Sequence, residues 1–274
     1  MKSYLAVCAI YRDEATYFPE WLEFHRLVGV EHFYLYDNGS TDESLDVLAP
    51  YLDAGIVTRH TWPRYPGQYE AYEHCAAVHA ADARWIAFID LDEFLFSPTC
   101  TPVAEMLRDY EDHVAVAVNW AVYGSGGHER RPDGLVIENY LWRVRDGGDP
   151  NRHVKAVADP SQVIRCRNPH YFFYKDGRRA VDPHFHPVPF ARTEGSSLDR
   201  LRINHYFTRS DEEFLQKLQK GRLAWQVSGY RKAIRRYREM GAERSEVRDE
   251  AILPYVPRVR EALAGAPAQR RGSA

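Results

Sequence analysis

The longest uninterrupted apolar segment of the chain, residues 4–11, reads Tyr-Leu-Ala-Val-Cys-Ala-Ile-Tyr. Apolar runs of this length, without alternation, are typical of strands that are buried on both faces of a parallel sheet. Residues 84–89 and 113–118 show a similar pattern, and residues 32–36 and 55–60 predict two further, shorter strands. The sequence therefore predicts a sheet whose central strands have no exposed face.

Segments that predict helices lie between these strands. We expect a helix over 16–28, with Thr16 as its N-cap, because apolar residues recur there at roughly helical spacing. A second helix should end near Pro50, and an alanine-rich helix should cover 68–82. Further along the chain, residues 211–240 predict one or two helices.

Strands and helices alternate through about the first 90 residues, which predicts a doubly wound α/β layer with right-handed crossovers. Ligands of such sheets bind at the carboxyl ends of the strands. Asp37 and the pair Asp90 and Asp92 each follow a predicted strand directly, so we expect them to face one cleft. The second half contains glycine- and proline-rich segments that should form loops over this cleft, around 124–134, 146–150 and 182–189.

Composition and charge exclude several classes of protein. The 274 residues include 36 Lys and Arg against 39 Asp and Glu, a formal net charge of −3. This balance argues against a nucleic-acid partner bound over the whole surface. No stretch approaches the roughly 20 apolar residues of a membrane helix, and the N-terminus lacks the pattern of a signal peptide. We therefore expect a cytoplasmic protein.

The strongest candidate for chemistry is the segment Phe88-Ile89-Asp90-Leu91-Asp92-Glu93-Phe94. Asp90 and Asp92 stand at i and i+2 after an apolar strand, and such a pair can hold a divalent cation that in turn holds a diphosphate. The alternative is a solvated acidic turn. Three acids next to a buried strand are costly, however, without a cation or hydrogen-bond partners.

A second candidate is the turn at residues 36–42, Tyr-Asp-Asn-Gly-Ser-Thr-Asp. Asp37 is placed to accept hydrogen bonds from a nucleobase edge at the end of its strand. Gly39 allows a positive φ in the turn. Ser40 or Asp42 is suited to cap the next helix, which is the structural interpretation of the same motif.

Further motifs follow one another along the chain: Arg12-Asp13-Glu14, Pro19-Glu20-Trp21-Leu22-Glu23-Phe24-His25, Asn119-Trp120, Gly124-Ser125-Gly126-Gly127-His128, His153-Val154-Lys155, Asn168-Pro169-His170 and Asn204-His205-Tyr206-Phe207. With the two acidic motifs, they resemble the nucleotide-sugar glycosyltransferases of the GT-A fold. Over roughly residues 4–225 the chain resembles glycosyltransferase family 92 and bacterial relatives in the family-2-like group.

The resemblance implies an α/β fold of the GT-A, Rossmann-like type, with a mostly parallel sheet flanked by helices and a C-terminal helical segment. Residues 1–240 would form the catalytic domain, divided into a nucleotide-binding half (1–110) and an acceptor and closing half (111–240). A C-terminal helix and a disordered tail would follow at 241–274. The implied activity is metal-dependent, inverting transfer from a nucleotide-sugar, often a UDP-sugar, to a glycan or other hydroxyl acceptor, with Mn or Mg as cofactor.

The site residues follow from these motifs. The nucleotide-sugar would contact Tyr11, Arg12, Glu14, Asp37, Asn38, Asp90, Lys155, Lys217 and Arg222. Asp90 and Asp92 would hold the metal with a late histidine, either His205 or His170. We favour His205, because it precedes the basic segment with Lys217 and Arg222. The pair His184 and His186 has metal-ligand spacing, but prolines flank it and a loop is the simpler interpretation.

Inversion needs a carboxylate that deprotonates the acceptor hydroxyl. Glu129, Asp133 and Glu138 lie in the loop region after Trp120, and Glu129 ranks first because it adjoins the glycine-rich loop. The dense basic residues at 231–238 suggest an acidic partner, such as an anionic membrane surface, and thus a peripheral position at the inner face of the membrane.

Two other functions compete with this interpretation. A nucleotidyltransferase also places acids at strand ends, but the chain shows no glycine-rich basic loop after its first strand to hold a triphosphate. A non-catalytic sugar-binding module would leave Asp37 and the Asp90–Asp92 pair without a role. Release of a nucleotide from UDP-sugars would separate the three functions.

Overall fold

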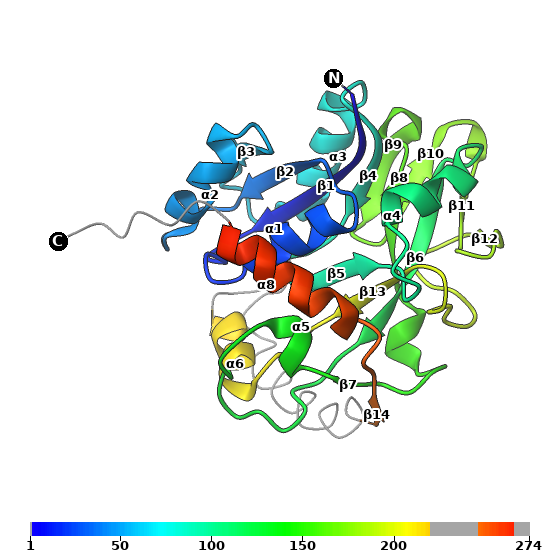
Figure 1. The fold of residues 1–274 in the computed structure, drawn as a ribbon. Helices are drawn as coiled ribbons and strands as arrows, with labels where there is room; N and C mark the ends of the chain where they lie inside the picture. The colour runs from blue at the N-terminus through cyan, green and yellow to red at the C-terminus, as the bar shows by residue number, and fades with distance from the viewer. Residues whose placement is uncertain (1, 220–245, 266–274) are drawn as a thin grey trace.

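The computed structural model describes residues 2–219 and 246–265. Its first half alternates strands and helices (Figure 1), in the order β1 (Ser3–Tyr11), α1 (Phe18–Leu27), β2 (His32–Asp37), α2 (Ser44–Asp53), β3 (Val57–Thr61), α3 (Gln68–Val78), β4 (Ala83–Phe88), β5 (Glu93–Phe96) and α4 (Val103–Met106). Short strands dominate the second half: β6 (Ala115–Val122), α5 (Val136–Asn139), β7 (Trp142–Arg143), β8 (Val154–Ala158), β9 (Val163–Asn168), β10 (Tyr171–Tyr174), β11 (Ala180–Val181), β12 (Pro187–Val188), β13 (Arg202–His205), α6 (Asp211–Gln219), β14 (Val247–Arg248) and α8 (Val256–Gly265).

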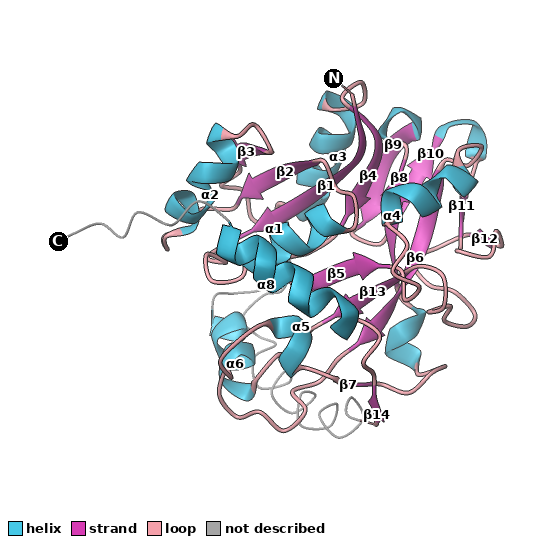
Figure 2. Ribbon diagram, in the orientation of Figure 1, coloured by secondary structure: helices cyan, strands magenta, loops and turns pink. Residues whose placement is uncertain are grey.

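A large mixed sheet forms the centre of the molecule (Figure 2). Its strands lie in the order β12-β11-β6-β8-β4-β1-β2-β3, and β13 pairs with both β5 and β6. The block of β3, β2, β1 and β4 is parallel, whereas β8 runs antiparallel to both β4 and β6. The parallel block confirms the predicted α/β layer, and its carboxyl ends place the turns after β1, β2 and β4 at one edge of the sheet.

The side chains of β1 alternate between two hydrophobic cores, which explains its continuous apolar sequence. Val7 and Ala9 pack in the core that α1 and α2 cover, and α8 lies against α1 on this face (Figure 1). Ala6 and Cys8 pack in the core on the other face, which is covered by α3 and the β9–β10 hairpin. The central strands are therefore buried on both faces, as predicted.

Three predicted helix boundaries are wrong. Tyr17, not Thr16, is the N-cap residue of α1, and its hydroxyl donates a 2.6 Å hydrogen bond to the distant Glu213. Helix α2 continues past Pro50 to Asp53, since Tyr51 packs into the core in the following turn. Helix α3 ends at Val78, four residues before the predicted end. The helical prediction for 211–240 is described only as far as α6, and residues 220–245 and 266–274 lie outside the described residues.

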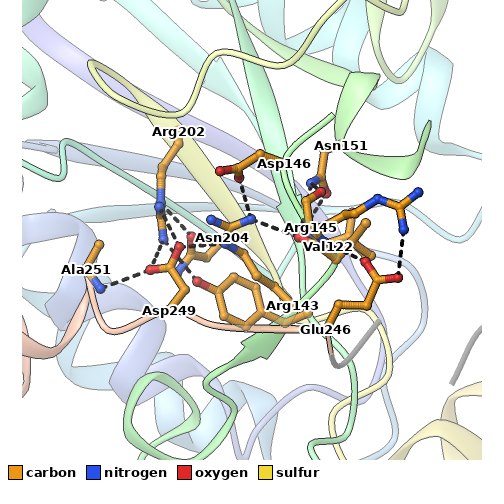
Figure 3. A network of polar contacts seen from close by, with 12 residues as sticks. Val122, Arg143, Arg145, Asp146, Asn151, Arg202, Asn204, Glu246, Asp249 and Ala251 are labelled. Carbon is orange, nitrogen blue, oxygen red and sulfur yellow. Dashed lines mark hydrogen bonds and ion pairs between the residues drawn. The ribbon is translucent and has the colours of Figure 1, made fainter. Parts of the chain in front are cut away.

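A buried ion network attaches the C-terminal segment to the rest of the molecule (Figure 3). Both carboxylate oxygens of Asp249 accept hydrogen bonds from Arg202, at 2.8 and 3.0 Å, and Arg143 donates to the same carboxylate at 2.6 Å. Arg202 also donates to the hydroxyl of Tyr123 and the amide oxygen of Asn204, both at 3.0 Å. The network joins β7, β13 and the segment that leads into α8.

Candidate active site

A cleft of about 760 Å³ opens at the carboxyl ends of β1 and β4. Its lining comes from segments that are far apart in the sequence. They include the loop after β1, the turn between β4 and β5, the end of β13 with the loop that follows, and α6, together with residues of α3, β6 and the β9–β10 turn. The parallel strands supply the floor because their carboxyl ends meet at this edge of the sheet.

The turn after β4 directs Asp90 and Asp92 into the cleft, as predicted. Asp90 accepts hydrogen bonds from the side chains of Gln68, at 2.7 Å, and Tyr72, at 3.1 Å, and pairs with the Lys155 ammonium at 2.9 Å. A carboxylate with three donors is held in one orientation. The Asp90 carboxylate at the cleft is therefore fixed in position, and the Lys155 ammonium compensates its charge.

Lys155 has a different position from the predicted one. It is fully buried on β8, where its ammonium lies 2.9 Å from Asp90 and 3.6 Å from Glu93, and it does not line the cleft. Burial alone would lower the pKa of Lys155, but these two carboxylates outweigh it and raise the pKa. The prediction that Lys155 contacts the nucleotide-sugar is wrong for this geometry, because β8 places it behind the acidic turn.

Asp92 forms a second charged group, which faces the cleft. Its carboxylate lies 3.4 Å from Nε2 of His205, and it forms an ion pair with the Lys217 ammonium of α6. Burial alone would raise the pKa of Asp92, but Lys217 and His205 hold it well below its usual range. Burial lowers the pKa of His205. The site therefore combines an ionised carboxylate with a neutral imidazole.

Asp92, Glu93 and His205 could together hold a metal ion, since each offers a ligand atom within 4.8 Å of the others. The His205 Nδ1 and Glu93 Oε1 atoms are buried and have no hydrogen-bond partner among the described residues. Carboxylate oxygens and a neutral imidazole are suitable ligands for Mn²⁺. The group thus fits a divalent cation, with Glu93 in the place where we expected Asp90.

The other candidate histidines are arranged differently. His170 lines the cleft, but its Nδ1 lies 2.8 Å from the Val154 carbonyl oxygen and its ring packs edge-on against Trp120. Burial lowers the pKa of His170 to about 3. His184 and His186 pair with different aspartates, Asp199 and Asp182. These three histidines are not part of the Asp92 group, so His205 is the late histidine nearest the acidic turn.

The predicted nucleobase residue, Asp37, is buried at the end of β2. It forms a 2.6 Å ion pair with Arg59 and accepts a 2.8 Å hydrogen bond from the Ser40 backbone N–H. Burial alone would raise the pKa of Asp37, but these partners lower it. Its neighbour Asn38 donates to the carbonyls of Trp62 and Arg64 and so holds the loop after β3.

Five of the predicted donor contacts line the cleft directly: Tyr11, Arg12, Glu14, Asp90 and Lys217. Asp37 and Asn38 are not among the lining residues but lie beside Tyr11, which pairs with Asp37 in the parallel register. Arg222 and the basic segment 231–238 lie outside the described residues. No helix in the described ranges 2–219 and 246–265 has the length and apolar character that crossing a membrane requires.

The three predicted bases do not line the cleft. Glu138 accepts a 2.7 Å hydrogen bond from the Leu135 backbone N–H and another of 2.7 Å from Arg260, so it caps α5. The described contacts of Glu129 and Asp133 involve their backbone carbonyls or, for Glu129, its charge near Asp211. The cleft is instead lined by other carboxylates, which we did not predict as bases: Asp13, Glu14, Glu212 and Glu213.

Sequence reasoning also missed Arg209 and Glu213. Ser210 and Glu213 form a capping box at the start of α6, with Oγ of Ser210 3.2 Å from the Glu213 N–H and a carboxylate oxygen of Glu213 3.1 Å from the Ser210 N–H. A Ser-x-x-Glu spacing is a recognisable helix start, so this signal could have marked the element. The same spacing does not show, however, that the start of α6 lies in the cleft.

The mostly parallel block of the sheet and the acidic cleft at its carboxyl edge are the α/β architecture expected for GT-A proteins. The model of glycosyltransferase family 92 matches residues 3–187, and the chain belongs to this family.

Sequence relatives agree with the family assignment. A family 92 protein of Ricinus communis is 29% identical over 221 residues, which cover 78% of this chain and 37% of the relative. One of Arabidopsis thaliana is 34% identical over 196 residues, or 65% of this chain and 32% of the relative. A galactan beta-1,4-galactosyltransferase of Arabidopsis thaliana is 30% identical over 104 residues, or 34% of this chain and 20% of the relative. The chain thus spans little more than a third of the length of the first of these relatives.

Among solved structures, S. aureus TarS 1–349 is similar to this chain with a TM-score of 0.36 and 14% identity, covering 58% of this chain and 47% of that chain.

Proposed function

We propose that this chain transfers a sugar from a nucleotide-sugar, with UDP-sugars as the first donors to test, to a hydroxyl group of a glycan acceptor. One observation carries the proposal: Asp92 and His205 face a cleft at the carboxyl end of a parallel strand, in a chain of family 92. A cleft of about 760 Å³ is large enough for a donor of this kind.

A divalent cation, Mn²⁺ or Mg²⁺, would be held by Asp92 and His205, with Glu93 behind them. When bound, such an ion supplies a Lewis acid for the charge of a diphosphate leaving group. Asp90 would orient the donor from its fixed position beside Gln68 and Lys155. Lys217 would contribute positive charge at the same end of the cleft.

The chain's own residues would position the two ends of the donor. Tyr11 and Arg12 line the part of the cleft that adjoins Asp37, so the nucleobase would lie there. Trp120 and His170 also line the cleft and present aromatic surface for a sugar ring. If the transfer inverts the anomeric carbon, its base must come from a carboxylate that lines the cleft, which excludes Glu138 in the observed geometry.

The test is incubation of the purified chain with a panel of nucleotide-sugars, with and without Mn²⁺, while nucleoside diphosphate release is measured. UDP-galactose comes first, because two relatives are galactan beta-1,4-galactosyltransferases. We expect metal-dependent release of UDP from at least one donor when an acceptor is present. Release of pyrophosphate from a nucleoside triphosphate and a sugar phosphate would instead identify a nucleotidyltransferase. Sugar binding without any release would identify a binding module.

A further inference from the structure

Arg209 is a buried arginine that lines the cleft and has an unusual environment. It lies between β13 and α6, with 8% of its surface exposed. Its backbone φ is +53°, in the left-handed region that non-glycine residues rarely adopt. Such conformations persist where the surrounding structure imposes them, and they concentrate at functional sites.

The guanidinium group is held from one face. Its central carbon lies 3.4 Å from the centre of the Tyr17 ring, a cation–π contact that fixes the plane of the group. Tyr17 is in turn held by its hydrogen bond to Glu213 of the α6 capping box, at 2.6 Å. The left-handed backbone at Arg209 and the ring of Tyr17 therefore determine together where the guanidinium points.

The same guanidinium makes few hydrogen bonds. Burial alone would lower the pKa of Arg209, but Tyr17 and the nearby carboxylates of Glu14, Asp92 and Glu213 raise it. One N–H donates to the Leu91 carbonyl at 3.3 Å, and the nearest carboxylate oxygen that pairs with it, from Glu14, is 3.7 Å away. Its buried Nε has no hydrogen-bond partner within the described part of the chain. A guanidinium has five N–H donors, and a buried charge with unused donors is costly. A bound anion in the cleft would satisfy them.

Lys217 differs in this respect, although it lies in the same cleft. Its ammonium is already paired with Asp92 and donates to the Phe207 carbonyl at 3.2 Å. Arg12 is more exposed, with 42% of its side chain accessible, and so remains hydrated. Among these three cleft cations, Arg209 is the one that is both desolvated and incompletely paired. Planar guanidinium groups also match phosphate oxygens bidentately.

We propose that Arg209 binds the diphosphate of the donor directly and stabilises the charge that develops on it as the sugar leaves. The inference rests on the proposed function and adds a catalytic residue to it. A bond forms between the anomeric carbon and the acceptor hydroxyl oxygen, whose proton passes to a base in the cleft. The bond that breaks joins the anomeric carbon to a diphosphate oxygen, and the electron pair stays on that oxygen. The guanidinium donates hydrogen bonds to the resulting diphosphate without transferring a proton.

The test compares UDP with UMP as probes in calorimetry with Mn²⁺, using the wild type, Arg209→Gln and Arg209→Lys. Arg209→Gln should weaken UDP binding at least about tenfold, the scale of a lost charge-assisted contact, while UMP affinity hardly changes. The UDP affinity of Arg209→Lys should lie between those of the wild type and Arg209→Gln, because lysine keeps the charge but loses the planar guanidinium. Arg248→Gln, on the exposed side of β14, is the control. Steady-state kinetics should show a fall in kcat for Arg209→Gln.

If Arg209→Gln weakens the binding of UDP and UMP by the same factor, Arg209 has a structural role and the inference is overturned. If Arg209→Gln does not fold, as judged by circular dichroism, Arg209→Lys carries the same comparison. A wild-type chain that binds neither UDP nor UMP would contradict UDP-sugar donors, and the inference would fall with that proposal. A wild type that binds UDP, with an unaltered ratio in the variants, overturns the inference alone.

Discussion

Strand β13 begins in one cluster of buried charge and ends in another. Arg202, at its start, belongs to the network with Asp249 (Figure 3), and His205, at its end, lies beside Asp92 in the cleft. The degree of burial does not separate the two clusters. Arg202 and Asp249 are 4% and 9% exposed, and Asp92 and His205 are 8% and 6% exposed.

The clusters differ in how completely their polar atoms are paired. Both oxygens of Asp249 accept hydrogen bonds from arginines, and Arg202 also donates to Tyr123 and Asn204. Around the cleft, polar atoms of Glu93, His205 and Arg209 have no hydrogen-bond partner among the residues that the structure describes. Buried polar atoms are normally paired. We therefore interpret the unpaired atoms beside the cleft as part of the proposed ligand site, and the paired network as a structural joint.

The largest effect is expected for Asp92→Asn. Transfer should fall about a thousandfold, the scale of a lost charge-stabilising contact in a transition state, because the variant loses the cleft's ionised carboxylate. The fold should persist, since Lys217 is 37% exposed and can be hydrated once its partner is neutral. Sugar transfer and thermal unfolding are measured in parallel, with Asp109→Asn, an exposed surface carboxylate, as control. Near-normal transfer by Asp92→Asn in excess chelator would contradict the metal site.

Asp249→Asn should produce the opposite pattern, a loss of stability. It leaves Arg143 and Arg202 buried without their shared carboxylate, and breaking a buried pair typically costs about 3–5 kcal/mol. The free energy of unfolding is measured by urea denaturation, with the exposed pair member Glu250→Gln as control. If Asp249→Asn unfolds no more easily than this control, the network is not the joint that its geometry indicates.

Asp37→Ala tests a residue that resembles both clusters. Asp37 is fully paired, like Asp249, but it lies next to the cleft, like Asp92. We expect UDP affinity to fall by about 1–3 kcal/mol, the scale of a lost charged hydrogen bond. Calorimetry with UDP measures this, and Asp46→Ala, on the exposed side of α2, is the control. Unchanged affinity would mean that the ion pair with Arg59 is purely structural.

The smallest effect concerns pH and the core beneath the acidic turn. His25 is fully buried, with Nδ1 2.8 Å from the Trp21 carbonyl and Nε2 accepting from the Leu95 N–H at 3.2 Å. Burial lowers the pKa of His25 to about 3, so below pH 6.5 the unfolded chain takes up a proton that the folded chain does not. Stability from this group is present above pH 6.5 and is lost as the pH falls toward 3.

Between pH 6.5 and 5 this loss should be roughly 1.5 kcal/mol. His25→Phe keeps an aromatic ring but cannot titrate, so its unfolding free energy should be lower at pH 7 and decline less over the same range. Urea denaturation at a series of pH values gives both quantities. Parallel slopes for wild type and His25→Phe would show that His25 is not the group responsible.

The sequence by itself determined the parallel block and the acids that follow its strands. Continuous apolar runs identified the strands, because a strand buried on both faces has no polar alternation. Asp90 and Asp92 could be placed at the cleft because acids that directly follow parallel strands share one edge. His205 was chosen from motif order alone, and it lies 3.4 Å from Asp92, while its role as a metal ligand stays a prediction.

Only the tertiary structure decided which charged side chains line the cleft and which lie behind it or hold other elements in place. Lys155 lies behind the acidic turn because β8 inserts antiparallel between β4 and β6, a pairing that its local sequence does not reveal. Glu138 caps a helix, while Glu213 and Arg209 reach the cleft from α6 and the loop before it. Sequence patterns predict local secondary structure and which face of a strand or helix is buried. The accessibility and pairing of a charge depend on contacts between segments far apart in the chain, here more than 60 residues from Asp90 to Lys155.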